Sequence, residues 1–276
     1  MAPSVVALVL FAALLHASWN ALLRGGEDRF WSMGVMNIAP GAIGLAVCLW
    51  VGLPSRESLP LVVLSGLLHI LYNALLVLTY RSGDLGQTYP IARGSSPALV
   101  SVGAALLAGE LLPLSAAIGV ALVSGGIIAL ALARGGVGRA GLLAALATGT
   151  TIAGYTLVDG LGVRVSGDWL AYTAAMFCFH LVLPAWLVAR RGARALAGKP
   201  KQLGMALAGG TISIAAYSVV IWAMQKGAMG AVSALRETSV VFAVLLGRIF
   251  LGETLTVNRI VASCVIAVGA VLIGHG

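Results

Sequence analysis

Three charged side chains lie inside long apolar stretches of the 276-residue chain. Arg93 lies within residues 85–108, and Arg236 and Glu237 lie within residues 228–250. An arginine at the centre of a bilayer costs at least ~2.5 kcal/mol on the gentler insertion scale, so each one needs a partner or a polar space. Guanidinium groups hold carboxylate, phosphate or phosphonate through paired donors. We therefore predict a binding site for a small anionic or zwitterionic molecule at these residues.

The same three residues also allow a structural alternative. A salt bridge among Arg93, Arg236 and Glu237 would hold distant parts of the chain together without binding a ligand. A combined role is open as well, in which the ligand competes with Glu237 for the arginines. Loss of transport on replacing Arg93 or Arg236 with alanine would separate the binding roles from the structural one.

Polar and aromatic side chains in other apolar stretches occur at helical spacings and could line the same site. His69, Tyr72 and Asn73 share one face of residues 59–80, and Thr148, Thr151, Tyr155 and Asp159 share one face of residues 139–161. Hydrogen bonding between helices is the alternative for each of them. The histidines, His16, His69 and His180, allow coupling to protons or another ion. The predicted substrate site comprises Trp19, Asn20, His69, Tyr72, Asn73, Tyr89, Arg93, Tyr155, Tyr217, Arg236 and Glu237.

Two prolines, Pro90 and Pro97, lie on either side of Arg93. A proline inside a helix removes one backbone hydrogen bond and frees the carbonyl four residues earlier, which for Pro97 belongs to Arg93. We expect a kinked or broken helix beside the site, as transporter sites often have. The aligned positions in the second half of the chain are Ser233 and Val240, so the two halves should bend differently.

Ten apolar stretches must position these residues. Sixty per cent of the residues are hydrophobic and nine per cent are charged, whereas soluble domains carry about 25% charged residues. About 20 apolar residues span a bilayer as a helix, and these stretches are too long and too uniformly apolar for barrel strands. We predict an all-α integral membrane protein with ten transmembrane helices. The stretches lie near residues 3–23, 30–52, 59–80, 85–108, 113–133, 139–161, 168–190, 202–224, 228–250 and 256–274.

Two features recur along the chain at the same distance. Glu110 and Glu253 are 143 positions apart, as are Arg93 and Arg236. We predict two five-helix repeats, residues 1–134 and 135–276, that together form one membrane domain. Because five is odd, the second repeat enters the bilayer from the opposite side. Such inverted repeats around a central cavity are typical of secondary transporters.

Several short motifs recur with the repeats. They are Trp19–Asn20 in the first stretch, the glycine before the fourth, and the turns Gly109–Glu110 and Gly252–Glu253. In these motifs and in its two-times-five plan, the chain resembles the EamA group of the drug/metabolite transporter superfamily. The resemblance implies an exporter or importer of small metabolites such as amino acids, driven by a gradient or by exchange. Consistently, the sequence contains no Gly-x-x-x-x-Gly-Lys-Ser/Thr phosphate loop for ATP.

Other functions are considered against the same residues. A membrane-embedded enzyme would need a nucleophile or metal motif, and neither Gly-x-Ser-x-Gly nor His-Glu-x-x-His is present. A non-catalytic assembly factor or a channel remains the other alternative. The three cysteines have no metal-ligand spacing, and the basic residues form no nucleic-acid patch. We therefore expect no cofactor, no metal and no nucleic acid, and a monomer or weak homodimer in the lipid bilayer.

The loop charges predict an orientation. Ten spans place both termini on one side, and few basic residues lie there, namely Arg56, Arg164 and Lys226. The positive-inside rule then makes the other side cytoplasmic and both termini external to an inner (plasma) membrane. Members of the resembling family usually have cytoplasmic termini, which is the opposite expectation. The basic residues of the other side are Arg24, Arg29, Arg81, Arg134, Arg139, Arg190, Arg191, Arg194, Lys199, Lys201, Arg248 and Arg259.

Overall fold

The computed structural model describes residues 1–23, 29–82, 85–133, 137–252 and 255–276. Within these residues, 89% of the chain is helical and there are no strands. Glu253 of the predicted repeat and Arg24 and Arg134 of the predicted cytoplasmic loops lie outside the described residues. The α-helices are α1 (Pro3–Leu23), α2 (Arg29–Met36), α3 (Ile38–Val51), α4 (Leu59–Ser82), α5 (Leu85–Ala108), α6 (Leu114–Leu132), α7 (Arg139–Ser166), α8 (Trp169–Cys178), α9 (Val182–Arg191), α10 (Pro200–Lys226), α11 (Met229–Glu237), α12 (Ser239–Leu251) and α13 (Val257–His275). Short 3-10 helices are η1 (Arg56–Ser58), η2 (Phe179–Leu181) and η3 (Ala193–Leu196).

Ten helical segments of the described chain are long and apolar enough to cross a bilayer, which confirms the ten predicted spans. Three spans consist of two consecutive helices: α2 with α3, α8 with α9, and α11 with α12. The outer surface is apolar as well, and Trp50, Leu106 and Phe250 are 81%, 80% and 75% exposed. Large exposed apolar side chains in this number suit lipid rather than water. The protein is therefore an all-helical, multi-pass membrane protein.

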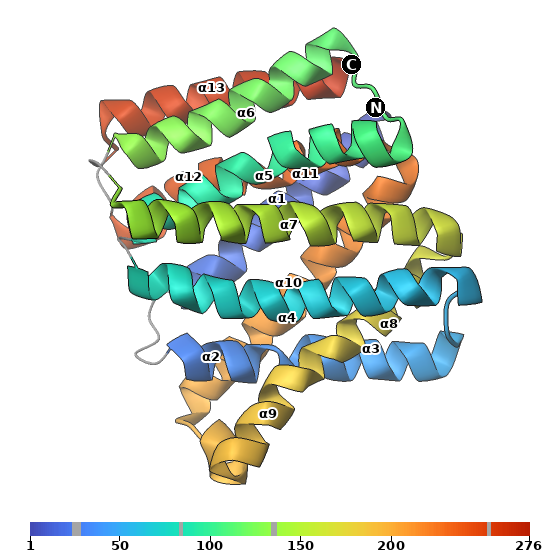
Figure 1. Ribbon diagram of the computed structural model, residues 1–276. Coiled ribbons are helices and arrows are strands. Elements are labelled where there is room, and N and C mark those ends of the chain that lie inside the picture. The colour runs from blue at the N-terminus through green and yellow to red at the C-terminus, as the bar shows by residue number, and fades with distance from the viewer. Residues whose placement is uncertain (24–28, 83–84, 134–136, 253–254) are drawn as a thin grey trace.

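The helices lie roughly side by side, and both termini are at the same end of the bundle (Figure 1). In the centre, α1 packs against α10 and α12, and α7 packs against α4 and α5. At the periphery, α6 packs against α13 and α3 packs against α8. The contacts of α1 with α10 and α12 correspond to those of α7 with α4 and α5, because each pair of corresponding helices lies five spans apart. The partners α6 and α13, and likewise α3 and α8, are themselves five spans apart. Two five-helix halves that contact each other in equivalent ways would give this pattern. The contacts therefore agree with the repeat, which stays a prediction.

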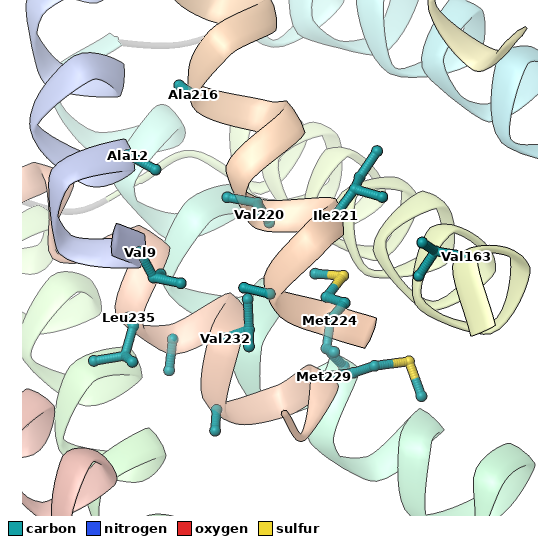
Figure 2. Close-up of a cluster of buried hydrophobic side chains, with 14 of the residues drawn as sticks. Val9, Ala12, Val163, Ala216, Val220, Ile221, Met224, Met229, Val232 and Leu235 are labelled. Atoms are coloured by element: carbon teal, nitrogen blue, oxygen red, sulfur yellow. The ribbon is translucent and has the colours of Figure 1, made fainter. Parts of the chain in front are cut away.

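A cluster of apolar side chains fills the space between the central helices towards the terminal end of the bundle. Figure 2 shows Val9 of α1, Met224 of α10 and Met229, Val232 and Leu235 of α11 within this cluster. All five side chains are buried. On α10, Met224 is seven residues closer to the terminal end than Tyr217. The predicted polar site therefore lies deeper in the bundle than this apolar cluster.

The prolines beside Arg93 do not break their span. α5 continues from Leu85 to Ala108 through both Pro90 and Pro97, so the predicted helix break is absent there. The interruption lies in the other half, at Thr238, between α11 and α12. Thr238 Oγ1 donates to the Leu235 carbonyl at 2.7 Å, and the Thr238 carbonyl accepts from Val241 N at 2.8 Å. Both bonds span three residues rather than the four of an α-helix, so the backbone is tighter here. The hydroxyl forms one of them, since a threonine hydroxyl competes for helix carbonyls.

Candidate functional site

The two predicted arginines and Glu237 meet in the centre of the bundle. Arg93 of α5 donates from Nε to Glu237 Oε2 at 2.6 Å. Arg236 of α11 donates from Nε and Nη2 to Glu237 Oε1, at 3.2 and 3.1 Å. Each carboxylate oxygen therefore serves one arginine. With all three groups ionised, two cations share one anion and a formal charge of +1 remains.

Close packing of α5 against α7 positions Arg93. Gly149 of α7 lies against α5, where a Cβ atom on Gly149 would lie 2.8 Å from the Ala92 carbonyl oxygen and would also meet Ser95 Oγ. Small residues allow such close backbone approach between membrane helices. On α11, all residues from Met229 to Glu237 are buried. Arg93 and Arg236 are thus held on two tightly packed helices rather than on loops.

The space at the arginines is closed in this structure. The side chains of Arg93 and Arg236 are 3% and 4% exposed, and that of Glu237 is 0% exposed. All three side chains of the ion pairs are therefore shielded from solvent in this structure. A ligand could reach the arginines only after the surrounding helices separate.

Several buried polar atoms near the arginines have no hydrogen-bond partner within the described part of the chain. They are Arg93 Nη2 and Ser96 Oγ on α5, His16 Nε2 on α1, Thr156 Oγ1 on α7 and Ser233 Oγ on α11. A buried unpaired donor or acceptor costs about 1–3 kcal/mol, so such atoms call for a specific explanation. All four helices belong to the central group in Figure 1. Donors and acceptors therefore remain available there for a polar ligand.

Aromatic residues predicted for the site form one connected cluster beside the arginines. The His69 ring stacks on Tyr155 with centroids 4.1 Å apart, and Tyr155 makes edge contacts with Tyr72 at 5.7 Å and Tyr217 at 6.0 Å. The Arg236 guanidinium lies 5.8 Å from the centre of the Tyr217 ring. These side chains come from α4, α7, α10 and α11, and the cluster joins both halves of the chain.

The remaining predicted residues lie at the edges of this group. Tyr89 is beside Arg93, with 5.7 Å between its ring centre and the guanidinium carbon. On α1, Trp19 Nε1 donates to His16 Nδ1 at 3.2 Å and Asn20 Nδ2 donates to the His16 carbonyl at 2.8 Å. Trp19 and Asn20 thus contact their own helix in this structure. Asn73 is half-buried on α4.

Asp159 is the central residue that the predicted site omitted. It is fully buried on α7. Its Oδ2 accepts from Tyr217 at 2.6 Å, and its Oδ1 accepts from Tyr172 of α8 at 3.1 Å. The signal was present in the sequence, because Asp159 is the only acidic residue in α7 and an intramembrane carboxylate is a functional candidate by default. Tyr172 carried no comparable signal.

The chain is similar to known proteins in both sequence and fold. Residues 139–274, close to half of the chain, match the model of the EamA-like transporter family. The chain belongs to this family. The EamA assignment confirms the family resemblance that the sequence motifs indicated. A solved crystal structure covers 98% of this EamA chain and 97% of its own length, with a TM-score of 0.76 and 22% identity, which extends the shared fold across both halves. No protein of curated function matches the EamA chain significantly.

Membership of the EamA family agrees with the ten apolar helices. The protein is a membrane transporter of the drug/metabolite transporter superfamily, and such proteins are generally not enzymes. A transporter implies a small-molecule substrate and a lipid bilayer as its surroundings. The described residues contain no group of three or more potential metal ligands.

Proposed function

We propose that this EamA protein carries a small anionic or zwitterionic metabolite, such as an amino acid, an organic acid or a phosphonate, across the inner (plasma) membrane. The observation that carries the proposal is the shared ion pair, in which two buried arginines have a single carboxylate between them. The spare charge and the unpartnered Arg93 Nη2 suit a second anionic group. Guanidinium groups bind carboxylate and phosphonate oxygens through paired donors.

Alternating access is the mechanism that we propose for this site. Arg93 and Glu237 are 144 positions apart and belong to different predicted repeats, so their ion pair crosses between the two halves. Rocking of one half against the other would open the site to one side at a time. A substrate that competes with Glu237 for Arg93 would loosen this contact and favour the movement. Transport in either direction is compatible with such a cycle, driven by exchange or by a gradient.

Binding and transport by arginine variants test this function. Purified protein is heated with a panel of amino acids, dicarboxylates and phosphonates, with choline as a cationic control, because a ligand selective for the folded form raises its melting temperature. Compounds that stabilise the protein are then followed in proteoliposomes. We expect Arg93→Ala and Arg236→Ala to abolish the stabilisation and the transport. Arg190→Ala, which changes an exposed arginine at the end of α9, should preserve both.

The result that would overturn the proposed site is equally direct. Folded Arg93→Ala and Arg236→Ala proteins that still bind and transport the same compounds would leave the ion pair with a structural role only. Arg93→Lys and Arg236→Lys provide a second comparison if the alanine variants fail to fold. Lysine keeps the charge but not the paired donors, so we expect weaker binding with retained stability.

The orientation that we propose follows from the loop charges and places both termini outside the cytoplasm. Figure 1 shows the two termini at the same end of the bundle. A reporter that is active only in the cytoplasm, fused after Gly276, should therefore be inactive. The same reporter inserted in the opposite loop, between Lys199 and Pro200, should be active. Activity at Gly276 would reverse the proposed orientation.

A further inference from the structure

A second buried carboxylate lies close to the arginines and has a different environment from Glu237. Among the described residues, Asp159 pairs with no arginine or lysine; instead, the tyrosines Tyr172 and Tyr217 donate to its two oxygens at 3.1 and 2.6 Å. Tyr217 also faces Arg236, whose guanidinium carbon lies 5.8 Å from the ring centre. One side chain therefore contacts both Asp159 and the arginine side of the proposed substrate site.

From this geometry we infer that Asp159 is a proton-binding site whose occupancy is coupled, through Tyr217, to anion binding at Arg93 and Arg236. The inference rests on the proposed function for its anion and adds the coupling ion. Asp159 is 0% exposed, so a charge on it is not shielded by water. The titratable side chains that interact with it are His69 of α4, Tyr155 of α7, Tyr172 of α8 and Tyr217 of α10. Arg93, Arg236 and Glu237 lie beyond Tyr155 and Tyr217.

The hydrogen-bond chemistry provides the coupling. An ionised carboxylate only accepts hydrogen bonds, so both of its oxygens can hold tyrosine donors. A proton that binds at Oδ2 turns that oxygen into a donor. The new O–H points at Tyr217, which favours Tyr217 accepting from Asp159 and directing its own hydrogen elsewhere, or moving away from the carboxyl group. The first change alters the hydrogen bonds of Tyr217, and the second shifts its ring, which lies against Arg236. No bond other than the O–H bond of the carboxyl group forms or breaks.

Charge balance gives the direction of the coupling. With Asp159 ionised, the two arginines and the two carboxylates have a net charge of zero, which gives an anion no electrostatic advantage. Protonation of Asp159 leaves one positive charge, which one anion neutralises. Proton and anion should therefore bind cooperatively, and by linkage the anion should raise the affinity of Asp159 for the proton to the same extent. A carrier of this kind moves both across the membrane together.

The first experiment uses the proton alone as the probe. Infrared difference spectra of the protein in lipid nanodiscs, recorded during a pH titration, detect the carbonyl stretch of a protonated carboxyl group. We expect a titrating band in the wild type that is absent from Asp159→Asn and present in Glu110→Gln, which removes a carboxylate outside the cluster. A band that persists in Asp159→Asn and disappears in Glu237→Gln would overturn the assignment to Asp159.

The second experiment measures the coupling to the anion. The melting-temperature shift produced by each stabilising compound of the panel is measured as a function of pH. We expect anionic compounds to stabilise the wild type more strongly as the pH falls, and to stabilise Asp159→Asn equally at all pH values. Tyr172→Phe removes a donor to the ionised carboxylate without touching the ring beside Arg236, so the pH midpoint should move upward. This variant tests the inference even if Asp159→Asn does not fold.

Two controls separate the inference from its alternatives. His69→Gln removes the neighbouring histidine, and loss of the pH dependence in this variant with its retention in Asp159→Asn would assign the proton to His69. Anions that bind Asp159→Asn and wild type with the same pH dependence would likewise overturn the coupling, although the proposed function would stand. If no anionic compound binds at any pH, the proposed function and the coupling both fail, and the infrared titration still decides whether Asp159 binds a proton.

Discussion

Glu237 is the residue on which both arginines depend, since each of its carboxylate oxygens accepts from one of them. Removing one partner of a buried ion pair leaves the remaining charges uncompensated. The sequence left a salt bridge among these three side chains as one alternative, and the geometry adds that Glu237 bridges the arginines. Removal of its charge therefore tests the structural and the binding roles at once.

At this residue we predict opposite effects on stability and on ligand response. Glu237→Gln keeps the shape of the side chain but removes its charge, so the protein should lose about 3–5 kcal/mol of stability. The stabilisation by an anionic ligand should increase, because the ligand no longer competes with Glu237. Melting temperatures with and without the stabilising compounds measure both effects. A variant that is destabilised and responds no more strongly than wild type would favour a purely structural ion pair.

At the scale of the helices, close contacts rather than helix breaks position the site. α5 passes through both prolines without interruption, while Gly149 lets α7 approach the backbone of α5 next to Arg93. The interruption at Thr238, directly after Glu237, is stabilised by local hydroxyl and backbone bonds. The two halves thus differ around the arginines. The helix is interrupted in the span of Arg236, which contains no proline, and is continuous in the span of Arg93.

Gly149→Ala tests this close contact. The added Cβ atom would lie 2.8 Å from the Ala92 carbonyl oxygen, so α5 and Arg93 must shift. We expect the melting temperature to fall, corresponding to about 1–3 kcal/mol as for other overpacked sites, together with weaker anion binding. Gly125→Ala on α6 is the matched control, because nothing lies within 4 Å of its added Cβ atom. Equal behaviour of the two variants would show that the contact does not position Arg93.

At the scale of the whole molecule, one ion pair ties the terminal end of the bundle together. Arg164, near the end of α7, pairs through Nη1 with Glu110 Oε1 at 2.5 Å and donates to the carbonyls of Met224 and Gly227 at 2.9 and 2.8 Å. Glu110 Oε2 also accepts from Met229 N at 2.9 Å. These bonds join α7, the α5–α6 connection and the turn between α10 and α11. Met224 and Met229 also belong to the apolar cluster of Figure 2, so both features lie at the same end.

Loss of this ion pair should favour opening at the terminal end. Met224→Cys, in a background with Cys48, Cys178 and Cys264 replaced by serine, reports opening through its reaction with a membrane-impermeant thiol reagent. A partly exposed pair contributes on the order of 1 kcal/mol, so Glu110→Gln should raise the labelling rate several-fold. Glu57→Gln, at an exposed carboxylate of the same end, should leave the rate unchanged. Unchanged labelling in Glu110→Gln would exclude a closing role for the pair.

The sequence by itself determined the ten spans and the central position of Arg93, Arg236 and Glu237. Both follow from local properties, because apolar length decides insertion and a buried charge must find a partner. Only the tertiary structure decided which partners meet. Arg93 reaches Glu237 over 144 positions, and Asp159 reaches Tyr217 over 58, through packing between helices that no periodicity along one helix encodes. The structure also decided that α5 keeps its helical course through two prolines and that the interruption lies at Thr238, where hydroxyl bonding competes with the backbone.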